Sequence, residues 1–61
     1  MMSGQEQLYN YYYNLQSKEM RSEIKGFKKL SMKGVNIAIK VIFKNDWLRV
    51  YQKSDGTVEW Y

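Results

Sequence analysis

The chain has 61 residues and a net charge of +4, and it contains neither His nor Cys. This length favours one small domain over residues 1–61, and the missing residue types exclude disulfides, thiol nucleophiles, imidazole bases and the usual zinc ligands. No apolar run reaches the roughly 18 residues of a membrane span, so we expect a soluble, cytoplasmic protein with no membrane partner. Without His or Cys, we also expect no metal or other cofactor.

The N-terminal half predicts a helix over residues 3–30, either continuous or as two segments that meet near Ser17. Residues 3–6 read Ser-Gly-Gln-Glu, the S-x-x-E form of a capping box, in which two backbone amides at a helix start find partners. A glycine inside this pattern, Gly26, costs ~1 kcal/mol relative to Ala in a helix interior. An apolar stripe that we expect to face a sheet recurs at steps of three and four: Tyr9, Tyr13, Gln16, Met20, Ile24 and Phe27.

A second stripe lies beside the first in the N-terminal part of the helix only. It consists of Leu8, Tyr12 and Leu15, with Tyr11 next to it. One sheet face is too small to cover both stripes, and contiguous apolar patches without an internal partner usually mark interfaces. We therefore predict a homodimer or partner contact at these four residues.

The C-terminal half predicts three strands, at about 35–44, 47–53 and 57–61. In the first of them the odd positions from 35 to 43 are all apolar, which is the period-two pattern of a strand with one buried face. Asn45-Asp46 and Ser54-Asp55-Gly56 have turn-forming composition. The predicted fold is α+β: an N-terminal helix packed on a three-stranded antiparallel β-meander, in the order α-β-β-β.

The turns also predict strand register. A two-residue loop at Asn45-Asp46 places Lys44 opposite Trp47, and a three-residue loop at residues 54–56 places Tyr51 opposite Glu59. A slip of one residue would exchange the faces of a strand, so the register that keeps the faces separate is favoured. The side chains expected to face the helix are Val35, Ile37, Ile39, Val41, Phe43, Leu48, Val50, Val58 and Trp60.

The other face of this sheet combines cations with aromatic rings. Its candidate binding residues are Lys40, Lys44, Trp47, Arg49, Tyr51 and Lys53. Rings on which bases stack, beside cations that neutralise phosphates, are typical of proteins that bind single-stranded nucleic acid. Cross-strand ring–cation pairs also stabilise exposed sheets by ordinary packing, which is the simplest alternative.

The cations are concentrated in one part of the chain, since no acidic residue lies between Ile24 and Asn45. A concentration of one sign attracts anionic partners. We therefore expect a small, basic, non-catalytic protein that contacts nucleic acid through the sheet. The alternative is a protein-binding inhibitor or adaptor, of the kind mobile elements encode. It would act on an acidic protein surface through Tyr and Trp, the residue types enriched in binding hot spots.

Overall fold

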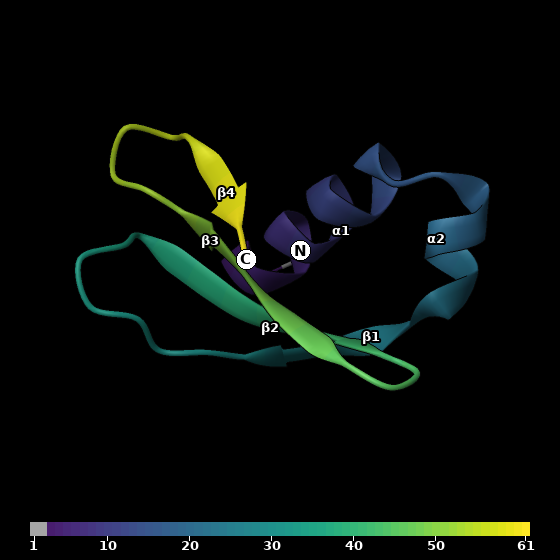
Figure 1. Ribbon diagram of the computed structural model, residues 1–61. Coiled ribbons are helices and arrows are strands. Elements are labelled where there is room, and N and C mark those ends of the chain that lie inside the picture. The colour runs from purple at the N-terminus through teal and green to yellow at the C-terminus, as the bar shows by residue number, and fades with distance from the viewer. Residues whose placement is uncertain (1–2) are drawn as a thin grey trace.

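The computed structural model describes residues 3–61, which form a four-stranded antiparallel sheet with α1 packed on one face and a short second helix, α2, leading into the edge strand (Figure 1). The strand order across the sheet is β1-β2-β3-β4, and α1 contacts the two central strands. The predicted α+β class is confirmed, with one strand more than expected. The elements are α1 (Gly4–Leu15), α2 (Lys18–Glu23), β1 (Ile24–Lys29), β2 (Ile37–Phe43), β3 (Trp47–Gln52) and β4 (Val58–Trp60).

Both helices are capped at the N-terminus by a serine, Ser3 for α1 and Ser17 for α2. Ser3 Oγ accepts a hydrogen bond from the Glu6 N–H, and Glu6 Oε1 accepts one from the Ser3 N–H, so the capping box is complete. After Leu15 the backbone becomes extended, and Ser17 Oγ accepts a bond from the Met20 N–H to start α2. The predicted break near Ser17 is therefore present.

The prediction of helix over 3–30 is wrong from Ile24 onwards, where the chain forms the edge strand β1. Ile24 pairs with Phe43 and Phe27 with Val41, and the register between the two pairs is interrupted by a bulge. A bulge inserts one extra residue on one strand. Two residues separated by three positions therefore share the helix-covered face, so this segment has the apolar spacing of a helix although it is a strand.

The β2–β3 hairpin keeps the predicted faces but has different partners. Trp47 pairs with Ile42 rather than with Lys44, a register difference of two residues. The Phe43 N–H donates to the Asp46 carbonyl at 2.8 Å, and the Asp46 carboxylate accepts a bond from the Trp47 N–H at 2.7 Å. A shift of two residues returns every side chain to the same face, so apolar alternation cannot distinguish the two registers.

The β3–β4 hairpin has the predicted register. The Lys53 N–H donates to the Thr57 carbonyl. Gly56 has a φ of 92°, a backbone conformation that residues with a side chain rarely adopt. The pairs that follow from this turn are Gln52 with Val58, Tyr51 with Glu59 and Val50 with Trp60.

The core lies between α1 and the central strands. Ile39, Val41 and Val50, all predicted to face the helix, have no exposed surface, so the predicted strand faces are confirmed. From the helix, Leu8 and Tyr12 complete the core. Ile37, Phe43, Leu48 and Val58 are partly buried against it, whereas Trp60 keeps 42% of its surface exposed and Val35 is half-buried.

The prediction of Leu8 and Tyr12 on a free surface is wrong, because both side chains are buried. Only 4% of the Leu8 surface and 2% of the Tyr12 surface are exposed to solvent. The predicted sheet-facing stripe was defined over residues 9–27, but α1 ends at Leu15. With the later residues in another helix and a strand, the face of α1 that covers the sheet includes Leu8 and Tyr12, with Tyr9 beside them.

Candidate functional site

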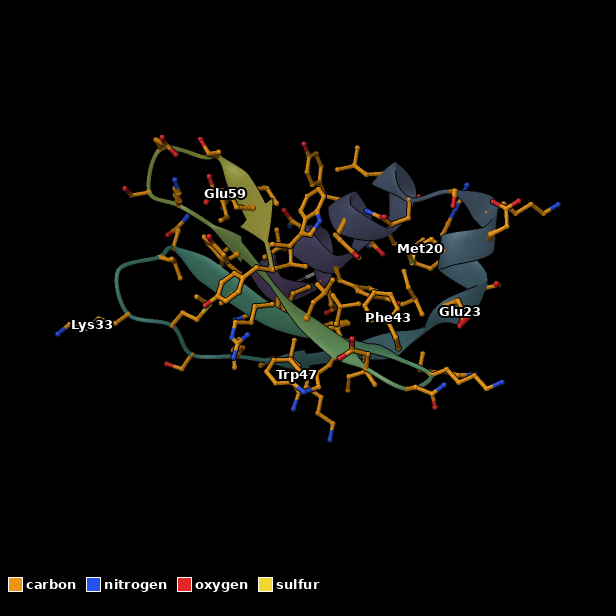
Figure 2. The ribbon with its side chains drawn as sticks, viewed as in Figure 1. Met20, Glu23, Lys33, Phe43, Trp47 and Glu59 are labelled. Atoms are coloured by element: carbon orange, nitrogen blue, oxygen red, sulfur yellow. The ribbon has the colours of Figure 1, made fainter. Side chains whose placement is uncertain are left out.

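The sheet face away from α1, called the open face here, carries most of the predicted binding residues. Side chains of directly paired residues on one face of an antiparallel sheet lie next to one another. Trp47 lies on the side of the sheet away from the helices (Figure 2). By pairing and alternation the open face contains Lys28, Ala38, Lys40, Ile42, Trp47, Arg49, Tyr51, Glu59 and Tyr61.

Two rings and two cations form a continuous cluster on this face. Lys40 Nζ lies 4.4 Å from the centroid of the Trp47 ring, and Arg49 Cζ lies 4.6 Å from it. The same guanidinium lies 4.8 Å from the Tyr61 ring centroid. Trp47 and Tyr61 nevertheless keep 41% and 63% of their surface exposed, so each ring has area available for a planar ligand.

The cations also form a row across the sheet. Lys28 pairs with Lys40, and Lys40 pairs with Arg49. Arg49 and Tyr61 exchange two backbone hydrogen bonds, of 2.9 and 3.0 Å, which places them opposite each other. We call these four residues the cationic row. Like charges directly opposite one another destabilise a sheet, and within residues 3–61 no carboxylate pairs with any of the three cations.

Two functional candidates lie outside the predicted binding residues, Lys28 and Tyr61. The prediction missed Lys28 because it assigned this segment to a helix. Two signals could have indicated it. One is the unbroken absence of acidic residues between Ile24 and Asn45, and the other is Gly26, which is unfavourable inside a helix.

A carboxylate neutralises the other corner of the open face. The Tyr51 hydroxyl donates to Glu59 Oε1 at 2.9 Å, and Lys53 Nζ lies 3.1 Å from Glu59 Oε2. The hydrogen bond from Tyr51, followed by that from Lys53, holds the pKa of the Glu59 carboxyl below its ordinary value. The bond to Glu59 raises the pKa of both the Tyr51 phenol and the Lys53 ammonium. The charge of Lys53 is therefore already compensated.

The predicted residues thus divide into three groups. Lys40, Trp47 and Arg49 lie together in the cluster. Tyr51 and Lys53 form the second group, because both contact the Glu59 carboxylate. Lys44 is exposed in the β2–β3 turn and makes no ring or ion-pair contact within residues 3–61.

The predicted N-terminal interface keeps two of its four members at the surface. Tyr11 is 52% exposed and Leu15 is 54% exposed. Burial leaves Leu8 and Tyr12 without area for a partner, so the interface remains a prediction for Tyr11 and Leu15.

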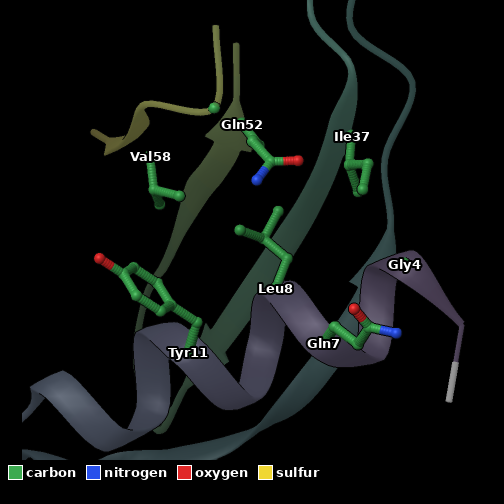
Figure 3. Close-up of a pocket in the computed structure, with 8 residues that line it drawn as sticks. Gly4, Gln7, Leu8, Tyr11, Ile37, Gln52 and Val58 are labelled. Atoms are coloured by element: carbon green, nitrogen blue, oxygen red, sulfur yellow. The ribbon is translucent and has the colours of Figure 1, made fainter. Parts of the chain in front are cut away.

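A cavity lies on the helix side of the sheet, between α1 and the β3–β4 hairpin (Figure 3). It has a volume of about 310 Å³ and an open mouth, and the Gln52 amide in its wall accepts a bond from the Asn36 amide at 3.3 Å. The sheet separates this cavity from the cationic row. Its lining consists of Gly4, Gln7, Leu8, Tyr11, Ile37, Gln52, Gly56 and Val58.

Two further observations concern other kinds of site. The described part of the chain brings no three metal-ligating side chains together. None of the described helices has the length and apolar content needed to cross a membrane.

Comparison with known proteins adds no relative. No family model, curated protein or solved structure gives a significant match to this chain.

Proposed function

We propose that this protein is a small non-catalytic nucleic-acid-binding protein and that the open face is its binding surface. The observation that carries the proposal is the cluster of Lys40, Trp47, Arg49 and Tyr61, in which cations and exposed rings alternate without a carboxylate. The cations can neutralise the phosphates of a nucleic acid, and its bases can stack on the rings.

In the free protein the cations lie over the rings, so a ligand has to replace those contacts. An exposed cation–π contact contributes about 0.5–1 kcal/mol. A base stacked on an aromatic side chain contributes about 1–3 kcal/mol, and the displaced cation gains a phosphate. Replacing the ring–cation contact by a stacked base and a cation–phosphate contact therefore favours the bound state.

The main structural alternative is that the ring–cation contacts only stabilise the sheet. They must then offset the repulsion between Lys40 and Arg49, which are directly opposite. That reading predicts no affinity for nucleic acid, and a binding measurement separates the two.

The test uses a fluorescently labelled oligothymidylate and measures anisotropy at increasing salt. We expect binding that weakens with salt, with a log–log slope at least as steep as about −1.4, from the two cations of the cluster at ~0.7 each. Trp47→Leu should weaken binding by about fivefold to 150-fold, the equivalent of about 1–3 kcal/mol of stacking. The matched variant Trp47→Phe retains a ring and should keep most of the affinity. Absence of binding at about 20 mM salt would refute the proposal.

A second candidate is an acidic protein surface. It is favoured by the residue types, because Trp, Tyr and Arg are the ones most enriched in binding hot spots. Affinity capture from a host lysate with and without nuclease treatment separates the two candidates. Nucleic acid recovered only without nuclease supports the first candidate. An acidic protein recovered under both conditions, and lost with Trp47→Leu, supports the second.

A further inference from the structure

We propose that an unpaired nucleic-acid strand crosses the sheet along the cationic row, perpendicular to the β-strands, and that one copy of the protein covers about three nucleotides. This inference rests on the proposed function and adds the path, the length and the single-stranded character of the ligand. It also assigns a phosphate contact to Lys28.

The direction follows from where the charges lie. Along β2 the positions on the open-face side are Ala38, which is buried, Lys40 and Ile42, and only Lys40 is a cation. A strand of nucleic acid laid along β2 would therefore meet one positive charge. Across the sheet, by contrast, the row presents three adjacent cations before it reaches Tyr61. The regularly spaced phosphates of a nucleic-acid strand therefore match the path across the sheet.

The length follows from the spacing of β-strands. Neighbouring strands lie about 4.8 Å apart, so the three cations cover about 10 Å and Tyr61 lies about 14 Å from Lys28. A stacked nucleic-acid strand carries one phosphate per ~3.4 Å, which places about three phosphates over the cations, and an extended strand places fewer.

The aromatic rings lie beside and at the end of the row, where the bases of such a strand could stack on them. On β3, Trp47 and Tyr51 flank Arg49 at a separation of two residues on either side, and Tyr61 ends the row. Tyr51 and Tyr61 contact each other edge to face, with centroids 6.0 Å apart. A phosphate backbone over the row therefore has exposed rings beside it at Trp47 and at its end at Tyr61.

This arrangement favours an unpaired strand. In a duplex the bases are paired and stacked inside, so a duplex could use the cations but not the rings. Stacking on one ring is equivalent to a factor of about 5 to 150 in affinity, and we expect a preference of this size for the unpaired strand.

The decisive variant is Lys28→Gln, with Lys29→Gln as its matched control. Both lysines are exposed on β1, but Lys29 pairs with the buried Ile39 and so points to the opposite face. With an eight-nucleotide oligothymidylate at about 50 mM salt, Lys28→Gln should weaken binding about eightfold and reduce the salt slope by ~0.7. Lys29→Gln should change neither quantity, and both variants should keep the native far-UV circular dichroism.

A length series and a duplex complete the test. Affinity should rise steeply from two to about three or four thymidylates and then only in proportion to the number of overlapping sites. Equal effects of the two lysine variants, or equal affinity for duplex and single strand, would overturn the inference. The proposed function would stand in that case if the Trp47 variants still behaved as described. Absence of binding to any nucleic acid would refute both.

Discussion

Replacement of Gly26 by Ala tests whether β1 is a bulged strand, and the sign of the effect carries the answer. In a helix interior the exchange would stabilise the protein by ~1 kcal/mol. In the structure, Gly26 has a φ of 152°, a backbone region that residues with a side chain rarely occupy. Such strain costs of order 1–3 kcal/mol. The Cβ of an alanine would meet no atom within 4 Å, so the backbone is the only source of the cost.

The net effect is smaller than the strain alone. Alanine also lowers the conformational entropy of the unfolded chain, which stabilises the fold by about 0.4–1 kcal/mol. The net destabilisation is therefore about 0–2.6 kcal/mol, and about 1.3 kcal/mol at the middle of both ranges. For a chain of this size each kcal/mol corresponds to about 4–8 °C in Tm, so the middle value lowers Tm by about 5–10 °C. A single hydrophobic core this small rarely supplies more than about 3–5 kcal/mol, so the loss is a large fraction of the total.

Thermal and urea unfolding followed by circular dichroism measure this effect. Lys29→Ala, at an exposed and regular position of the same strand, is the control and should change stability by less than about 0.5 kcal/mol. A stabilising Gly26→Ala would refute the bulged strand. It would also remove Lys28 from the open face, because the bulge determines to which side that lysine points.

Three further outcomes are expected. Ile39→Val should lower the free energy of unfolding, measured in urea, by about 0.5–1.5 kcal/mol because Ile39 has no exposed surface. Ile42→Val, on the open face of the same strand, should lower it by less. Equal losses would contradict the assignment of faces. Glu59, whose pKa is lowered by hydrogen bonds from a phenol and an ammonium group, should stabilise the fold above its ordinary pKa of 4.5. The Tm difference from Glu59→Gln should shrink as pH falls from about 6 to 3, and a constant difference would argue against the pair. Leu15→Asp should leave circular dichroism native and lower any self-association seen in sedimentation, whereas Leu8→Asp should unfold the chain, since the two side chains are 54% and 4% exposed. Unchanged sedimentation of a self-associating protein would remove Leu15 from the interface.

The parts of the fold that the sequence predicted correctly depend on local patterns. The capping box needs only Ser3 and Glu6, three residues apart, and the break at Ser17 likewise follows from a serine cap. The β3–β4 register follows from a three-residue turn that ends in Gly56. The faces of β2 and β3 follow from alternation, because a side chain two residues along a strand always returns to the same side.

Two parts of the fold could not be predicted from residue patterns, one because it depends on a distant segment and the other because two registers keep the same faces. Ile24 and Phe27 are spaced as on a helix, and only pairing with β2 turns their segment into a strand with an inserted residue. The choice between Lys44 and Ile42 as the partner of Trp47 leaves every face unchanged, so a turn hydrogen bond decides it.

By itself, then, the amino-acid sequence determined the caps, the turns and the separation of an apolar face from a cationic, aromatic one, since each arises from neighbours a few residues apart. Tertiary structure alone decided that Leu8 and Tyr12 enter the core and that Lys28 joins Lys40 and Arg49. Both outcomes depend on which segment packs beside which, and the free energy of that packing comes from residues far apart in the chain.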